Sequence, residues 1–80
     1  MANKTLIQQH IAVYPGVQQG RPCIKDTRTP VYVILEALAL GMSAAEIQKE
    51  YGPITKEAIQ ACILFAAQLA NEQESPLLSA

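Results

Sequence analysis

The order of hydrophobic and polar positions divides the chain into an N-terminal arm and a helical remainder. Residues 6–13 mix apolar and β-branched side chains around His10, which predicts a strand. The Tyr-Pro-Gly sequence at residues 14–16 supplies turn chemistry, because proline presets φ and glycine accepts a positive φ. Residues 19–31 are too rich in proline and glycine for a helix, so we expect an edge strand or an extended arm there.

A first helix is predicted from about Pro30 to Leu40. Thr29 can cap the free amides, and proline at the first helical position loses nothing by lacking an N–H. Gly41 ends the helix as a left-handed residue. Apolar residues at i, i+3, i+4 and i+7 form one stripe for packing: Val31, Ile34, Leu35 and Leu38.

Two further helices follow in the sequence. Ser43 and Glu46 have the spacing of a capping box, which predicts a short helix from Ser43 to about Tyr51. Residues 52–54 break it, and Thr55 caps a third helix that runs to about Asn71. The apolar surface of this helix is wide, which predicts burial on more than one side: Ile59, Cys62, Ile63, Phe65, Ala66, Leu69 and Ala70.

The predicted fold class is mainly α, with an N-terminal β-hairpin arm and a three-helix, helix-turn-helix-like bundle. Eighty residues allow one domain, so we assign residues 1–29 to the arm, 30–71 to the bundle and 72–80 to a flexible tail. A core this small, built from aliphatic side chains, is marginal by itself. A second copy of the chain would stabilise it, and we expect a homodimer.

Composition narrows the chemistry. Cys23 and Cys62 show no C-x-x-C spacing, and no secretory signal precedes them, which favours a reducing cytoplasm. No apolar run is long enough to cross a membrane. His10 has no partners at metal-ligand spacing, and although His10 and Cys23 are nucleophilic residue types, no third group completes a catalytic set. We therefore expect no enzyme activity, metal, cofactor or small-molecule substrate.

Charge is distributed unevenly along the chain. The first forty residues carry four basic and two acidic side chains, and the remaining forty carry two basic and five acidic ones. The arm places Arg21, Lys25 and Arg28 close together in sequence, where they could contact DNA phosphates or a partner's carboxylates. The structural alternative is that Arg28 pairs with Asp26 or Glu36, or caps carbonyls of the same turn.

The second and third predicted helices, joined by residues 52–54, form a helix-turn-helix outline. In that outline Thr55, Lys56 and Gln60 lie near the start of the third helix, where recognition helices meet base edges. Glu57 in the same turn opposes phosphate binding, and the apolar character of the helix favours a core or interface role.

Residues 15–31 and 41–47, followed by Tyr51 and residues 54–61, closely resemble the signature of the domain of unknown function 433 family. The resemblance covers about Ile11 to Asn71. It implies a homeodomain-like helical domain with an N-terminal hairpin, usually dimeric and found in bacteria and archaea. Some relatives resemble antitoxins that bind a PIN-like ribonuclease toxin and also their own promoter.

The sequence departs from the family pattern at three positions. The family usually has glycine where this chain has Gln19 and Asp26, and an aliphatic residue where it has Thr29. Asp26 tolerates a positive φ better than most residues, so its turn should survive. The resemblance favours a non-catalytic antitoxin-like module that binds a PIN-like toxin; the alternative is a stand-alone DNA-binding regulator.

Overall fold

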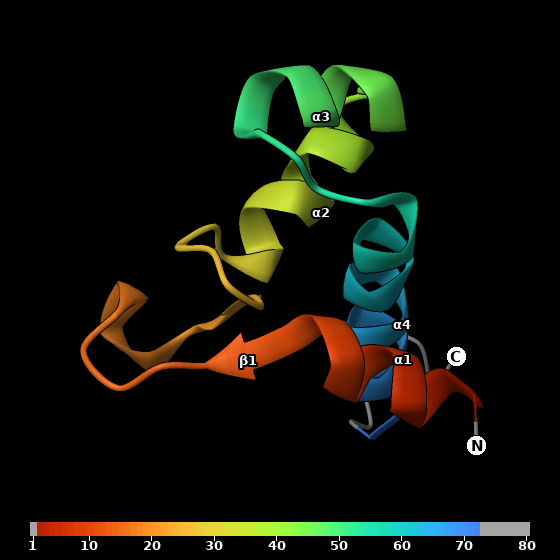
Figure 1. The fold of residues 1–80 in the computed structure, drawn as a ribbon. Coiled ribbons are helices and arrows are strands. Elements are labelled where there is room, and N and C mark those ends of the chain that lie inside the picture. Colours follow the sequence, from red (N-terminus) through yellow and green to blue (C-terminus); the bar gives the residue numbers. More distant parts are fainter. Residues whose placement is uncertain (1, 73–80) are drawn as a thin grey trace.

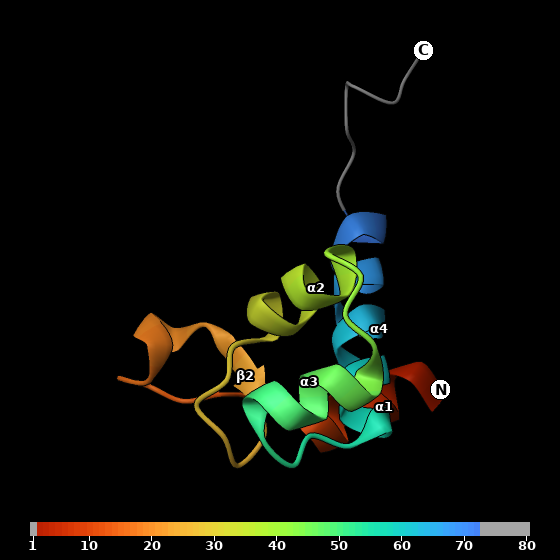
Figure 2. The same ribbon diagram turned by 90° about the horizontal axis from the view of Figure 1, so that it is seen from above.

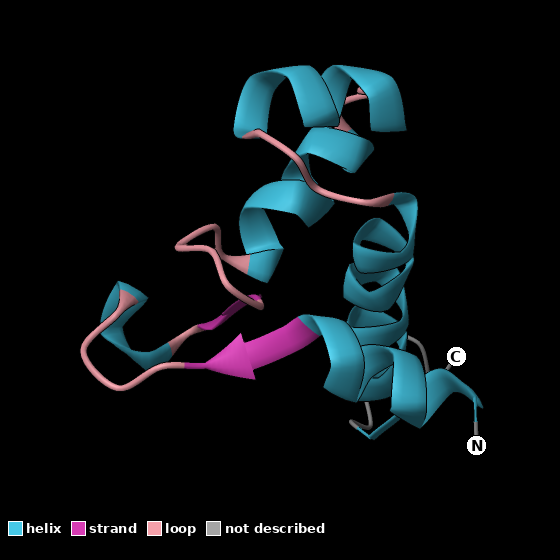
Figure 3. Cartoon of the chain, in the orientation of Figure 1, coloured by secondary structure: helices cyan, strands magenta, loops and turns pink. Residues whose placement is uncertain are grey.

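The computed structural model of the chain describes residues 2–72, which form four α-helices and one short antiparallel hairpin (Figure 1, Figure 3). In chain order the elements are α1 (Ala2–His10), β1 (Ile11–Val13), the 3₁₀ turn η1 (Gln18–Gly20), β2 (Pro22–Ile24), α2 (Val31–Ala39), α3 (Ala44–Tyr51) and α4 (Lys56–Glu72). The mainly helical class and the N-terminal hairpin are confirmed. The expected count of three helices is wrong, because a fourth precedes the hairpin.

The additional helix is α1, and it replaces most of the strand predicted over residues 6–13. Only Ile11–Val13 is a strand, since the residues before it include lysine, leucine and glutamine, which favour helix. Tertiary packing adds to that preference: α1 lies beside α4 and contacts it more than any other element does (Figure 1). A strand-like pattern eight residues long, over residues 6–13, was too short to decide between the two states.

The hairpin pairs β1 with β2 in antiparallel register, with Ile11 opposite Ile24 and Val13 opposite Pro22. Its connection contains η1, in which Gln19 adopts φ 58° and ψ 31°, in the left-handed region. Asp26, in the turn after β2, has φ 65°. Both are positions where the resemblance implies glycine, and a left-handed backbone is the conformation that glycine adopts without strain.

The start of α2 differs from the prediction. Pro30 is the N-cap rather than the first helical residue, and no side chain caps the helix. Thr29 instead pairs with the last residue of β2, because its carbonyl accepts a hydrogen bond from the Ile24 N–H (3.0 Å). A bridge between Cys23 and Pro30 continues this pairing up to the helix.

The remaining helix ends follow the predicted chemistry. Gly41, with φ 92°, closes α2: its N–H donates to the Leu38 carbonyl, while the Met42 N–H donates to Ala37, as in a Schellman motif. Ser43 and Glu46 form the capping box of α3, with both reciprocal hydrogen bonds present. Each exchange satisfies backbone groups that the helix leaves unpaired.

A small aliphatic core joins α2, α3, α4 and β2. Figure 2 shows the arrangement of these four elements from above. Its most enclosed large side chains, Ile34 and Ile47, have no exposed surface. The other buried members are Ile24, Val31, Ala37, Ile54, Ala58, Ile59 and Cys62. Within residues 2–72 no buried polar side-chain atom lacks a hydrogen-bond partner.

Two further predictions concerned the C-terminal tail and the absence of a membrane-spanning segment. Of the predicted tail, residues 72–80, only Glu72 is described, and it is the last residue of α4. The rest of that tail lies outside the described residues. In the described part of the chain, no helix has the length and apolar character needed to cross a membrane.

Candidate functional site

An apolar groove runs between α2 and the second half of α4. Its volume is about 470 Å³, and it is open to solvent along one side. Seven of its eight lining residues are uncharged and predominantly apolar; the set is Arg21, Pro22, Val31, Tyr32, Leu35, Phe65, Ala66 and Leu69. A groove of this size and lining is typical of a site that receives apolar side chains.

The geometry of α2 explains why the groove stays open. Val31, Ile34 and Ala37 recur at every third position and are buried against the core. Tyr32 directly follows Val31, so its side chain points to a different face of the helix, and it is 48 % exposed. On α4, Leu69 is 43 % exposed, because the core residues of that helix lie in its first half. Large apolar side chains therefore line the groove without filling it.

Among the described residues that line the groove, Arg21 is the one with a charged side chain. Its guanidinium carbon lies 5.7 Å from the centroid of the Tyr32 ring, a cation–π distance. The backbone of Arg21 is fixed by its N–H, which donates to the Gln18 carbonyl (3.1 Å). Within residues 2–72 no carboxylate pairs with Arg21, so its five donors remain available to a ligand.

A second, smaller hollow of about 210 Å³ continues from the groove toward the end of α4. Phe65 and Leu69 line both spaces, so they are adjacent. The smaller hollow is completed by Ile7 of α1, together with Gln68 and Glu72. The apolar surface thus extends from the Arg21–Tyr32 pair to the last residue of α4.

Lys25, predicted as a partner-binding residue, is used within the fold. Its ammonium donates to the Gln8 carbonyl at 2.8 Å, and its N–H donates to the His10 carbonyl at 2.8 Å. Both carbonyls belong to the C-terminal end of α1, where a positive charge is favourable. Lys25 therefore closes α1 onto the hairpin.

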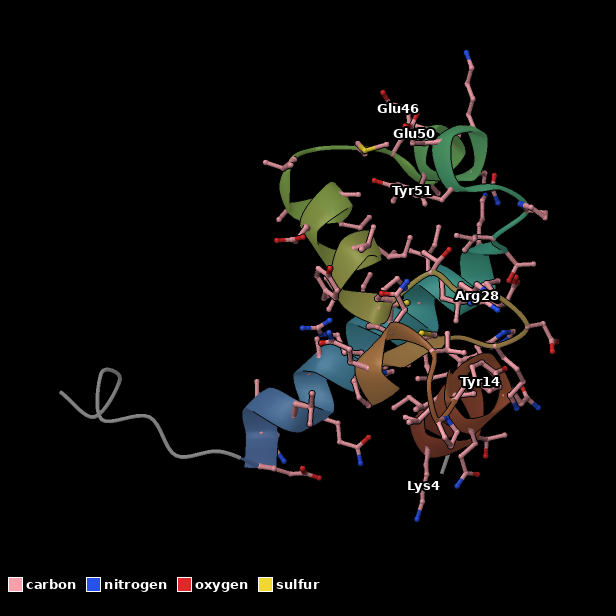
Figure 4. All side chains as sticks on the ribbon, turned by 90° about the vertical axis from the view of Figure 1, so that its left-hand side faces the viewer. Lys4, Tyr14, Arg28, Glu46, Glu50 and Tyr51 are labelled. Atoms are coloured by element: carbon pink, nitrogen blue, oxygen red, sulfur yellow. The ribbon has the colours of Figure 1, made fainter. Side chains whose placement is uncertain are left out.

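Arg28 lies elsewhere, on the outer side of the arm. It lines an open, partly polar hollow with Tyr14, Val17, Asp26 and Thr27. In the side-chain view Tyr14 and Arg28 both belong to the arm (Figure 4). No ion pair joins Arg28 to Asp26 or Glu36 within the described chain, so the predicted internal pairing is not formed. The three cations of the arm therefore lie in different surroundings. Arg21 contacts the Tyr32 ring, Lys25 binds the end of α1, and Arg28 lines the polar hollow.

Thr55, Lys56 and Gln60 are exposed around the start of α4. The Thr55 hydroxyl accepts a hydrogen bond from the Ala58 N–H (3.1 Å), so the predicted cap is confirmed. One acidic side chain lies in the same helical turn, since Glu57 directly follows Lys56. Two more, Glu46 and Glu50, lie on the preceding helix, α3 (Figure 4).

The two cysteines are enclosed in the core and have no exposed surface. Burial raises the pKa of the Cys62 thiol to about 11, so it stays protonated at neutral pH. Within residues 2–72 no group of three or more His, Cys, Asp or Glu side chains is placed to hold a metal ion.

Sequence reasoning missed the groove as a site, although it found part of its lining. The wide apolar surface of the last helix, including Phe65 and Leu69, was the usable signal. The pairing of the Tyr32 ring with Arg21 depends on a tertiary contact between α2 and the arm, which no local pattern predicts. Ile7 could not be assigned to the groove, because residues 6–13 were predicted to form a strand.

Comparisons with known proteins agree with this fold. The family model described as "Protein of unknown function (DUF433)" matches residues 11–66. A solved structure, that of a DUF433 member protein from Anabaena variabilis ATCC 29413, superimposes with a TM-score of 0.72 at 25% sequence identity. The superposition covers 89% of this chain and 70% of that one. No curated protein matches the chain.

Proposed function

The chain belongs to the DUF433 family of proteins of unknown function, and we propose that it is a non-catalytic, antitoxin-like module that binds a PIN-like ribonuclease toxin. The observation that carries this proposal is the open apolar groove with an unpaired arginine at its rim. Such a surface binds a partner that presents apolar side chains next to a carboxylate.

The chemistry of Arg21 fits the active site of such a nuclease, in which clustered carboxylates hold Mg²⁺. A guanidinium can donate two parallel hydrogen bonds to one carboxylate, and its planar shape matches that geometry. Contact with Tyr32 orients the guanidinium in advance, which lowers the entropy cost of binding. Tyrosine and arginine are also the residue types that most often dominate binding energy at interfaces.

A homodimer is the second part of the proposal, and it uses a different face of α4. Ile63, Ala67 and Ala70 recur at i, i+4 and i+7, and Ile63 is 47 % exposed. Residues 58–71 contain no charged side chain. In a two-fold symmetric interface each helix meets its own copy, so an uncharged strip avoids like-charge repulsion. Light scattering at micromolar concentration should give a dimer, and Ile63→Asp should give a monomer.

Co-expression with the product of the neighbouring gene tests the function. The two proteins should co-purify as a stable complex, and Tyr32→Asp combined with Leu69→Asp should abolish it. The matched control is Lys56→Ala with Gln60→Ala, which changes the other exposed end of α4 and should leave the complex intact. Repeated failure of the wild-type pair to co-purify would overturn the proposal.

Exposure of Lys56 and Gln60 at the start of α4 supports a second candidate, a stand-alone DNA-binding regulator with α3 and α4 as its helix-turn-helix. Glu57 weakens it, because its carboxylate repels phosphates in the same helical turn. If this candidate is right, Lys56→Ala with Gln60→Ala reduces promoter binding and its salt dependence. Absence of promoter binding at low salt removes it.

A further inference from the structure

The groove between α2 and α4 has the size and the composition of a small-molecule site. Its volume of about 470 Å³ lies within the range of roughly 300–1,000 Å³ that such sites occupy. Sites of this kind are mostly apolar and carry a small number of polar groups that orient the ligand. Here Val31, Leu35, Phe65 and Leu69 contribute to the apolar lining, and Arg21 contributes the charge. The groove therefore suits a ligand with an apolar body and one anionic group.

The walls of the groove are held in place by the fold. Val31 is buried in the core at the start of α2, and Phe65 packs against the same core from α4. Pro22, on the third side, belongs to β2 and lies opposite Val13 of β1. Because these walls belong to packed elements, binding orders few further side chains. A small ligand can therefore bind with the free energy of its own few contacts.

Arg21 selects the chemical class of the anion. Its contact with the Tyr32 ring holds the guanidinium at the groove, and no carboxylate of the described chain pairs with it. A guanidinium binds a carboxylate through two parallel hydrogen bonds. One arginine balances the single negative charge of a carboxylate, whereas a phosphate monoester carries a charge of about two and would remain partly unpaired. A monocarboxylate is therefore the anion that this groove matches.

The other end of the groove fixes the orientation of such a ligand. Phe65 and Leu69 continue into the smaller hollow, which Glu72 also lines. A carboxylate there repels a second negative charge, so the anionic group of the ligand belongs at Arg21. The apolar body then lies toward Phe65 and Leu69, and the smaller hollow of about 210 Å³ gives room for a longer body.

We propose that the groove binds a small monocarboxylate with an apolar body, whose carboxylate pairs with Arg21 and whose body packs against Phe65 and Leu69. The compound is a ligand and not a substrate. Its binding is independent of the proposed function, but its consequence rests on that function: the same surface receives the apolar side chains and the carboxylate of the toxin. The ligand therefore competes with the toxin, and an abundant ligand releases it.

Titration of phenylbutyrate into the isolated protein, followed by NMR, tests the site without any partner. The amide signals of Tyr32, Leu35 and Leu69 should shift with a dissociation constant of about a millimolar, as expected for a ligand of about a dozen heavy atoms. Phenylbutanol and phenylbutylamine keep the apolar body and replace the carboxylate. Both should bind about fivefold more weakly or worse, which corresponds to the loss of one ion pair at a protein surface.

Three variants assign the binding to the groove. Arg21→Gln should weaken phenylbutyrate binding about fivefold and remove its advantage over phenylbutanol. The matched control is Arg28→Gln, which removes the other arginine of the arm, outside the groove, and should change neither value. Ala66→Phe fills the groove and should weaken binding of phenylbutyrate and phenylbutanol alike. Arg21 and Arg28 are exposed, so both glutamine variants should keep the wild-type melting temperature.

Equal affinity for phenylbutyrate and phenylbutanol would overturn the proposal, as would the absence of groove shifts at about ten millimolar phenylbutyrate. So would groove signals that already move when the free protein is diluted, because a second copy would then occupy the groove. Competition separates this inference from the proposed function: phenylbutyrate should dissociate the complex with the neighbouring gene's product. A complex without groove shifts by phenylbutyrate refutes the ligand alone, and groove shifts with an undisturbed complex refute only toxin binding at the groove.

Discussion

The region where α4 begins and the region where it ends obey local structural rules to different degrees. At the beginning, α3 has a complete capping box, Thr55 caps α4, and the nearby Ile47 and Ile54 are buried. Near the end, the groove and the arm leave Tyr32 and Leu69 exposed. The first region is built like a stable core.

The arm also carries the backbone exceptions of the described chain. Gln18, Gln19 and Asp26 have positive φ values without being glycine, and Arg21 directly follows η1. Positions that violate local preferences tend to lie at functional sites, where binding rather than stability determines the residue. We therefore infer that the region around the α3–α4 turn stabilises the fold, and that the groove, together with the arm residues that line it, serves binding.

Core truncation should show the largest difference between the two regions. Ile47→Ala leaves a cavity among α2, α3 and α4 and should lower the free energy of unfolding by about 2–4 kcal/mol. Leu69→Ala removes a half-exposed side chain and should cost about 1 kcal/mol or less. Urea denaturation measures both values. Equal losses would contradict the assignment of stability to the first region.

Helix capping gives an effect of intermediate size. Thr55→Ala removes the acceptor for the Ala58 N–H and should cost about 1 kcal/mol. Thr29→Ala is the matched control, because no side chain caps α2 and this hydroxyl was wrongly expected to do so. Thermal unfolding should show a clear decrease for the first variant and a smaller one for the second. The reverse order would place the functional cap on α2.

A change in the arm should increase stability. Gln19→Gly relieves a left-handed conformation that costs a side-chain-bearing residue about 1–2 kcal/mol, offset in part by the greater freedom of glycine in the unfolded chain. We expect a net gain of about 0.5 kcal/mol in urea denaturation. Gln9→Gly, the same exchange within α1, should instead lower stability by about 1 kcal/mol. A loss at both positions would show that Gln19 is not strained.

The smallest effect concerns pH. Hydrogen bonds from the backbone and side chain of Ser43 lower the pKa of the Glu46 carboxyl below its usual 4.5. The resulting stabilisation is present above pH 4.5 and is lost as the pH falls through the lowered value. Glu46→Gln should therefore flatten the decline of melting temperature in acid. Glu50→Gln, on the same helix but outside the capping box, is the control and should decline like the wild type.

How far the sequence predicted the molecule depended on the range of the interactions involved. The capping box of Ser43, the cap at Thr55 and the left-handed Gly41 use neighbours within a few residues, and all three were found from sequence. The helix at residues 2–10 was missed because packing against α4 helps to decide it.

The site followed the same principle. Phe65 and Leu69 were recognised as part of an excess apolar surface, but their arrangement with Tyr32 into a groove required the tertiary structure. Lys25 was predicted to bind a partner or nucleic acid, and its contact with the Gln8 carbonyl spans seventeen positions of sequence. Contacts of that range leave no periodic trace in a single sequence.

Oxidative footprinting of the complex with the neighbouring gene's product tests most directly whether the groove is the binding surface. Tyr32 and Tyr51 form a matched pair, because their side chains are 48 % and 37 % exposed. Tyr32 lines the groove, whereas Tyr51 is the last residue of α3, next to the start of α4. The partner should protect Tyr32 from oxidation and leave Tyr51 as reactive as in the free protein. Protection of Tyr51 with Tyr32 unchanged would contradict this expectation.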